Sequence, residues 1–318
     1  GENGDGIGSG STENLALMLL KSTVKVGAAT ILSRILGFIR DIVFARYFGG
    51  SGATVAFFLA FKIPNFMRRL FGEGAFSLAF VPILAEYKEK HSREALRDLI
   101  DHVAGSLGTV LLVLTALGSI AAPLLVYLFA PGFWDDPERF DLTADMLRIT
   151  FPYLFFVSLT AFAGGVLNTY GRFSVPAFTP VLLNVVLIAA AVWVAPLLEQ
   201  PIMALAYAVF VAGVVQLLFQ LPFLASIRAL PKPRWRPQHE GVRRAFRLMV
   251  PAIFGSSVAQ INVLLSGIIA SLLPVGSISY LYYSDRLMEF PLGLFSIALA
   301  TVTLPYLSRL WANEEKRE

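Results

Sequence analysis

The feature that most constrains this chain is a recurrence of apolar stretches, each long enough to cross ~30 Å of hydrocarbon at about 20 residues per helix. Leu, Ala, Val and Phe dominate them, and they lack the polar–apolar alternation of membrane β-strands. Apolar residues make up 56% of the chain and charged residues only 15%, a balance that a water-soluble surface does not allow. The sequence therefore predicts an all-α polytopic membrane protein. The eight predicted spans cover residues 24–49, 53–85, 103–130, 144–169, 175–198, 201–226, 245–273 and 276–308.

These spans divide the chain into three parts. Residues 1–15 are rich in Gly, Ser and acids without an apolar run, and are predicted to be a linker or a cloning remnant. Residues 16–228 hold six spans and are expected to form a complete N-terminal lobe. Residues 229–318 are expected to hold a basic loop and the first two helices of a second lobe, whose remainder is absent. This division rests on a weak internal repeat, AFSLAFVPIL at 75–84 and ALATVTLPYL at 298–307, because parallel repeats of this kind build transporters.

The charges between the spans predict the orientation of the chain. Lys and Arg gather in the segments 86–102 and 226–247 and in the C-terminal tail, which fall on one side if the spans alternate. The opposite side receives short turns and an acidic loop with Asp135 and Asp136. Because basic loops stay in the cytoplasm, both ends of the chain are predicted to be cytoplasmic. This bias alone accounts for the basic loops, so no nucleic-acid partner is expected.

Charged residues inside the first, second and eighth spans mark the candidate site, because each costs about 2.5–3.5 kcal/mol at mid-bilayer. Arg34 and Asp41 are seven residues apart and so share a helix face. Arginine's planar fork matches phosphate oxygens and keeps its charge, which favours a diphosphate-bearing ligand over a cationic drug. Lys62 is instead predicted to snorkel. The predicted substrate-binding residues are Arg34, Arg40, Arg68 and Arg286. The predicted supporting or gating residues are Ser33, Asp41, Glu73, Asp285 and Glu289.

Enzyme chemistry has little support in this sequence. Cysteine is absent, only three histidines occur, and no Gly-rich phosphate loop or metal-ligand spacing is found. A transporter is therefore expected rather than an enzyme, with no cofactor and no metal site. Uncompensated arginines should attract an anion such as chloride when substrate is absent. Coupling to an ion or to the membrane potential is left open.

Five motifs resemble the MurJ/MviN family of lipid II flippases, within the multidrug/oligosaccharidyl-lipid/polysaccharide exporter superfamily. They are SRILGFIRD (33–41), FKIPNFMRRLFGEGAFSLAFVPILAEY (61–87), APGF (130–133), LNTYGRFSVPAFTP (167–180) and YYSDRLMEFPLG (282–293). The resemblance covers essentially residues 20–310. It implies two pseudo-symmetric helical lobes around a central cavity, in the bacterial inner membrane. It also implies that the family's essential cavity arginines fall at Arg34, Arg40, Arg68 and Arg286, and its acidic residue at Glu73.

The resemblance implies a substrate as well, lipid II, an undecaprenyl-diphosphate-linked disaccharide pentapeptide. Such a protein moves it from the cytoplasmic to the periplasmic leaflet by alternating access, for peptidoglycan synthesis and cell shape. Its partners would be lipid II, membrane lipids and the missing C-terminal half. One departure is Val55, where the family carries an acid near the outward gate; either the gate closes differently or the residue was engineered. The alternatives are an exporter of another polyprenyl-linked oligosaccharide or drug, and a non-transporting cell-wall scaffold.

Overall fold

The computed structural model describes residues 9–69, 76–289 and 291, and within them the chain is helical and contains no β-strand. The described helices are α1 (Ser9–Tyr47), α2 (Gly52–Arg68), α3 (Ser77–Lys90), α4 (Arg93–Ile120), α5 (Ala122–Phe129), α6 (Pro137–Thr150), α7 (Tyr153–Thr169), α8 (Ser174–Ala189), α9 (Met203–Ser226) and α10 (Glu240–Ser271). A further helical segment covers residues 277–289. The predicted linker's first eight residues, Glu73, the second repeat copy and the C-terminal tail lie outside the described residues.

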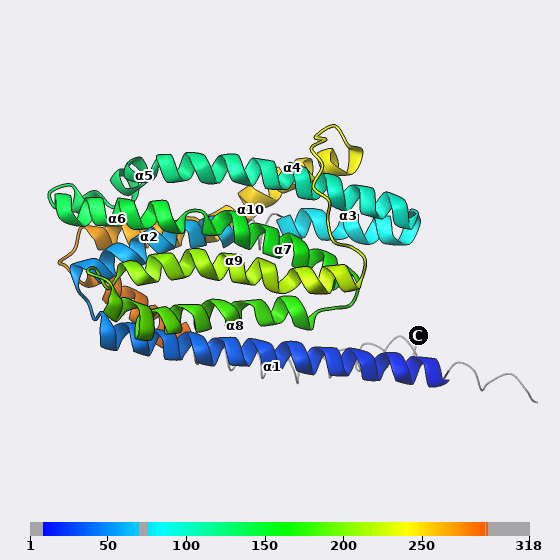
Figure 1. The fold of residues 1–318 in the computed structure, drawn as a ribbon, viewed down its shortest axis with the longest axis horizontal. Helices are drawn as coiled ribbons and strands as arrows, with labels where there is room; N and C mark the ends of the chain where they lie inside the picture. Colours follow the sequence, from blue (N-terminus) through cyan, green and yellow to red (C-terminus); the bar gives the residue numbers. More distant parts are fainter. Residues whose placement is uncertain (1–8, 70–75, 290, 292–318) are drawn as a thin grey trace, which may run out of the picture.

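The helices run side by side as an elongated bundle (Figure 1). Helix α1 forms one edge and packs on α8, which packs on α9, and α9 in turn packs on α7. Helix α2 packs on α6, while α10 packs on α3 and α4. The fold class predicted from the sequence is confirmed, because an all-helical bundle of apolar helices is what the structure contains.

Four helical runs are long and apolar enough to cross a membrane, among the residues the structure describes. They are Arg93–Ile120, Pro137–Thr169, Ser174–Leu197 and Met203–Ser226, which correspond to the third to sixth predicted spans. Large apolar side chains such as Leu112, Leu117 and Ile120 point outward on α4 and are exposed. In a membrane such side chains face lipid, so this surface fits a polytopic protein.

The helix boundaries differ from the predicted ones in two places. The segment 86–102 is helical almost throughout, because α3 continues to Lys90 and α4 begins at Arg93. The Ser92 side chain accepts a hydrogen bond from the Ala95 amide at 3.2 Å, which caps α4 well before the apolar run begins. The predicted third span is also not one helix, because α4 ends at Ile120 and α5 begins at Ala122 with a proline in its first turn.

Two separate clusters of buried apolar side chains hold the bundle together. One surrounds α2 and contains a run of aromatic rings, in which Phe57 stacks on Phe61 with centroids 5.9 Å apart. The other joins α3, α4, the second half of α7 and the start of α10 around Phe80 and Phe162. Val55, the departure from the family pattern, is 2% exposed in the first cluster. Its side chain therefore serves packing here.

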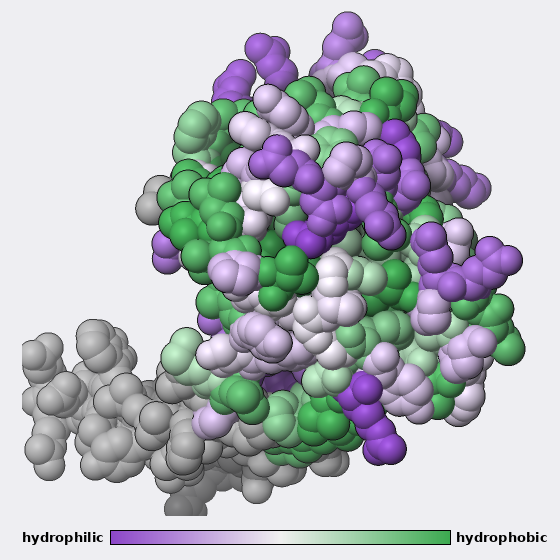
Figure 2. Space-filling model, turned by 90° about the vertical axis from the view of Figure 1, so that its left-hand side faces the viewer, coloured by the Kyte–Doolittle hydropathy of each residue, from purple (hydrophilic) through white to green (hydrophobic). Residues whose placement is uncertain are grey.

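The polar connections separate to the two ends of the bundle. The turns after α1, α5 and α10 lie at the left-hand end of Figure 1, where Figure 2 shows many hydrophilic side chains gathered on the end face. The α3–α4 turn and the basic segment 227–239 lie at the other end. This alternation matches the grouping of acidic and basic segments predicted from the sequence.

Candidate functional site

A cavity of about 930 Å³ lies between α1, α8 and the helical segment 277–289. Three of the four predicted arginines line it, together with most of the predicted supporting residues. The polar and charged lining residues are Thr30, Ser33, Arg34, Arg40, Asp41, Asn168, Asn184, Arg286 and Glu289. Apolar lining comes from Val26, Phe38, Phe173, Pro176, Ala177, Pro180 and Leu183. Charged and polar side chains therefore share the cavity wall with apolar ones, which contribute the larger part of its surface.

Helix α1 supplies one wall because its small and charged residues recur at helical spacing. Ser33, Gly37 and Asp41 follow one another at intervals of four residues, and Arg40 comes three residues after Gly37, so all four face the same side. Asn184 of α8 approaches this face, and its amide donates to the Ser33 carbonyl oxygen at 3.0 Å. The contribution of Ser33 to this network is therefore its main chain rather than its hydroxyl.

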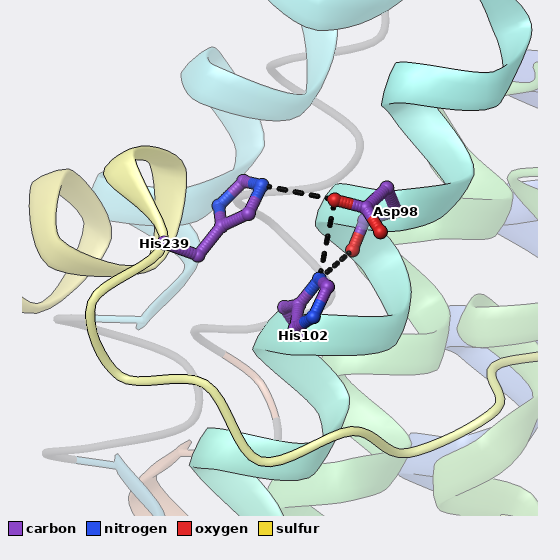
Figure 3. Close-up of side chains that lie close together, drawn as sticks. All are labelled: Asp98, His102 and His239. Carbon is purple, nitrogen blue, oxygen red and sulfur yellow. Dashed lines mark hydrogen bonds and ion pairs between the residues drawn. The ribbon is translucent and has the colours of Figure 1, made fainter.

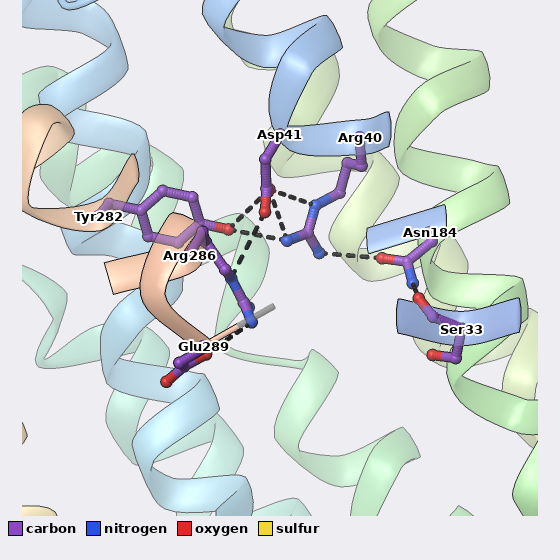
Figure 4. A network of polar contacts seen from close by, with 7 residues as sticks. All are labelled: Ser33, Arg40, Asp41, Asn184, Tyr282, Arg286 and Glu289. Atoms are coloured by element: carbon purple, nitrogen blue, oxygen red, sulfur yellow. Dashed lines mark hydrogen bonds and ion pairs between the residues drawn. The ribbon is translucent and has the colours of Figure 1, made fainter. Parts of the chain in front are cut away.

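Arg40 and Asp41 form a buried ion pair at the centre of the site (Figure 4). Arg40 Nη2 donates to Asp41 Oδ1 at 2.7 Å, and Nε donates to the same oxygen at 3.0 Å. Arg40 Nη1 donates to Asn184 Oδ1 at 3.0 Å. The two charged residues are only 4% and 5% exposed. A buried pair is stable only with such additional hydrogen bonds, because each charge loses its hydration.

Tyr282 connects this pair to the segment 277–289. Its hydroxyl accepts a hydrogen bond from Arg40 Nη2 at 2.8 Å and donates to Asp41 Oδ1 at 3.1 Å. Its ring stacks on Phe58 of α2, with centroids 4.0 Å apart. Residues far apart in the sequence are thus joined in one hydrogen-bonded network.

Arg286 lies one turn beyond Tyr282, between two carboxylates. Its Nε is 3.4 Å from Asp41 Oδ2, which is an ion-pair distance without hydrogen-bond geometry. Its Nη1 donates to Glu289 Oε2 at 3.1 Å. The guanidinium also lies 5.6 Å from the centre of the Tyr282 ring. Arg286 is therefore held by partners on both sides.

Arg34 differs from the other two cavity arginines. It lines the cavity, yet within the part of the chain that the structure describes it forms no ion pair. Arg40 and Arg286 are instead paired with Asp41 and Glu289. The positive charge in the cavity that no carboxylate balances therefore belongs mainly to Arg34. The sequence did not predict which arginine would carry it.

Other predicted residues lie outside the cavity lining. Arg68 is half-buried on α2 and donates from Nε to Asn65 Oδ1 at 2.9 Å. Asp285 is exposed and is not among the lining residues. Lys62, predicted to snorkel, turns toward α10, where a Cβ on Gly267 would lie 2.8 Å from its Nζ. Arg68 is thus not among the residues that line this cavity, so its predicted role in binding stays a prediction, and Glu73 lies outside the described residues.

Sequence reasoning missed Asn184 and Tyr282. A signal existed for each of them. Asn184 is an isolated amide in an apolar stretch, and a polar group within a membrane helix requires a partner. Tyr282 precedes Arg286 by one helical turn in the motif YYSDR, which places both on one face.

Comparisons with known proteins identify the family of this chain. The family profile described as lipid II flippase MurJ matches residues 44–318. The probable lipid II flippase MurJ of Haemophilus influenzae is 49% identical over 293 residues, which cover 90% of this chain and 58% of that protein. The lipid II flippase MurJ of Burkholderia cenocepacia is 47% identical over 304 residues, covering 94% and 59%. The chain thus spans less than two thirds of the length of these relatives.

Solved structures give the same result. A lipid II flippase MurJ in an inward closed conformation is 31% identical and superimposes with a TM-score of 0.75, covering 90% of this chain and 59% of that one. An outward-facing multidrug transporter of the MATE family and MOP superfamily shares the fold with a TM-score of 0.62 at 16% identity, covering 85% and 60%. The profile match, which spans most of the sequence, shows that this chain is a multi-pass membrane protein that belongs to the lipid II flippase MurJ family.

Proposed function

We propose that this chain acts in the translocation of lipid II from the cytoplasmic to the periplasmic leaflet of the inner membrane. The observation that carries the proposal is the cavity in which Arg34, Arg40 and Arg286 converge. A lipid-linked diphosphate presents several anionic oxygens, which arginine forks bind bidentately. Membership of the family supports lipid II as the compound that bears this diphosphate.

The ion pairs suggest the order in which the arginines engage. Arg34 is available at once, because it has no carboxylate partner among the described residues. Arg286 is 37% exposed and can exchange Glu289 for a phosphate oxygen. Arg40 is nearly fully buried and keeps Asp41, so its role is to position Asp41 and Tyr282. In this scheme Arg34 and Arg286 bind the diphosphate and Arg40 maintains the wall of the cavity.

The same network links the two parts of the protein that are proposed to move relative to each other during transport. It connects α1 of the first lobe to the segment 277–289, so a phosphate that draws Arg286 away weakens a contact between them. Alternating access by relative rocking of two repeats is the usual mechanism of such transporters. The proposal places the basic segments and the N-terminus of α1 in the cytoplasm, and a chloride ion at Arg34 when no substrate is present. The protein is proposed to be a transporter and not an enzyme.

A binding measurement on the purified chain tests the arginine assignment. Arg34→Ala and Arg286→Lys should each weaken lipid II binding by about tenfold or more, because each removes a charge-assisted fork of roughly 1.5–3 kcal/mol. Arg148→Ala is the matched control, because Arg148 forms an exposed pair with Asp145 away from the cavity. Equal affinities of all three variants would refute the assignment.

A second measurement distinguishes transport from binding alone. The Arg286→Lys change is introduced into the full-length transporter, in a strain depleted of its own flippase, and lipid II accessible in the outer leaflet is measured. Loss of accessible lipid II at normal expression supports translocation. Binding without translocation by the unmodified protein would favour a scaffold, and preferential binding of another polyprenyl-linked sugar would favour a different exporter.

A further inference from the structure

A second polar cluster lies away from the arginine cavity, at the end of the bundle that carries the basic segment 227–239 (Figure 3). Asp98 and His102 are one turn apart on α4, so their side chains share a face. His239 comes from the start of α10, where its Nδ1 accepts a hydrogen bond from the Gly241 amide at 3.2 Å. The cluster therefore joins α4 to the start of α10, the first helix after the basic segment.

Two of the three distances between ligand atoms in this cluster fit a metal site. His102 Nδ1 and His239 Nε2 each lie 3.3 Å from Asp98 Oδ2. The ligand atoms of all three residues lie within 4.8 Å of one another. Around a tetrahedral zinc ion with bonds of roughly 2.0–2.1 Å, neighbouring ligand atoms are about 3.3 Å apart. Two edges of the tetrahedron are thus already at the required length.

Three changes are needed: one ring must rotate, and each imidazole must move its proton to the other ring nitrogen. His102 Nδ1 donates to the Asp98 carbonyl oxygen at 2.8 Å, and this hydrogen bond is given up when Nδ1 binds an ion. The two imidazole rings are stacked, with centroids 5.0 Å apart and planes 16° apart, so one ring must rotate before both nitrogens address one ion. When Nε2 of His239 binds a metal, the ring proton moves to Nδ1, and the hydrogen bond from Gly241 is given up. Asp98 is 44% exposed at its side chain, which leaves a path for the ion and a place for water as the fourth ligand.

A further charged partner of the cluster comes from the basic segment. Arg234 Nη1 lies 4.0 Å from Asp98 Oδ1, so this arginine offsets part of the carboxylate's charge while no ion is bound.

The surrounding chain holds the cluster in place. The basic segment runs along α4, where the Lys232 amide donates to Asp101 Oδ1 at 2.7 Å and the Arg234 amide donates to the Asp101 carbonyl at 3.0 Å. Gly105 leaves no room for a Cβ against the Arg234 main chain. An ion bound by His239 would therefore add a third attachment between this segment and α4.

We propose that Asp98, His102 and His239 form a binding site for Zn²⁺ that fastens the start of α10 and the preceding basic segment to α4. Two imidazoles and one carboxylate are a ligand set that zinc accepts, with one position left for water. The sequence predicted no metal site, because the two histidines lie on helices that only the fold brings together. The site is independent of the arginine cavity and of the proposed transport.

The test is zinc binding by the purified, metal-free chain in detergent, without a histidine tag, in competition with a chromogenic chelator. One equivalent of Zn²⁺ is expected to bind. His102→Gln and His239→Gln should each weaken binding by about 100-fold or more, since changes even to residues that only orient ligands cost 10–100-fold. His91→Gln is the matched control, because the third histidine stacks on Tyr87 outside the cluster.

Two further readouts use the unmodified chain, so they do not depend on whether the variants fold. Co²⁺ bound by the unmodified chain should show the visible absorption of a tetrahedral site, and Zn²⁺ but not Mg²⁺ should slow tryptic cleavage within residues 227–239. Absence of zinc binding by the unmodified chain would overturn the proposal, leaving an ion-pair cluster only. Equal affinities in the unmodified chain and His239→Gln, or equal loss in His91→Gln, would overturn it as well.

Discussion

Replacing Asp41 by asparagine tests how the buried charges of the cavity are balanced. Asp41 is 5% exposed and compensates Arg40 at 2.7 Å and Arg286 at 3.4 Å. Asparagine keeps the volume and removes the charge, so the nearly buried guanidinium of Arg40 is left with neutral partners only. Removing one member of a buried pair costs about 3–5 kcal/mol, because the other charge remains desolvated. We expect the free energy of unfolding to fall by that amount.

The assay is equilibrium unfolding of the purified chain in mixed micelles, followed by tryptophan fluorescence. Asp145→Asn is the control, because its pair with Arg148 has a comparable separation of 2.6 Å but both side chains are about half exposed. An exposed pair contributes roughly 0–1 kcal/mol, so the control should lose little. If both variants lost equal stability, the argument that burial makes the Asp41 charge indispensable would be refuted.

Three other outcomes follow from the packing, the caps and the topology. Gly118→Ala should lower the stability of the α4–α6 packing by about 1–3 kcal/mol in the same assay, because a methyl group there would overlap the Phe151 ring; an unchanged midpoint would contradict this contact. Ser51→Ala should cost about 1 kcal/mol by removing the cap of α2, and Ser51→Thr should largely retain it. A cysteine at Asp136 should react with an impermeant thiol reagent from outside spheroplasts while one at Gln238 should not, against a background free of cysteine; the reverse pattern would invert the proposed orientation.

Much of the architecture follows from local sequence pattern. The length and hydropathy of the apolar runs predict membrane helices, because a backbone in lipid must satisfy its hydrogen bonds internally. The four runs that qualify by length and composition lie where the third to sixth spans were predicted. Errors occur at the boundaries, as with the helical ends of α3 and α4, because helices continue into polar sequence wherever a residue such as Ser92 can cap them.

The candidate site was likewise predicted in part from the sequence, and the rest of it depends on how the helices pack. Helical spacing on α1 predicted that Arg34 and Asp41, seven residues apart, share a face, and both line the cavity. Which residues form hydrogen bonds with Arg40 was decided by the tertiary structure alone. Packing of α1 on α8 places Asn184 beside Arg40, and the position of segment 277–289 places Tyr282 beside the same guanidinium. Periodicity within one helix carries no information about which face of another helix it meets.

That limit also explains the two outcomes furthest from the sequence prediction. Arg68 lies within a predicted membrane span, as Arg34 and Arg40 do, yet the orientation of α2 leaves its side chain out of the cavity lining. His102 and His239 have no sequence spacing that indicates a common site, yet the packing of α10 on α4 brings both to Asp98. The sequence by itself determined which segments are helical, which are apolar and which charges share a helix face. The tertiary structure decided which of those charges are neutralised and which stay available, because Coulomb and hydrogen-bond energies depend on distances between helices.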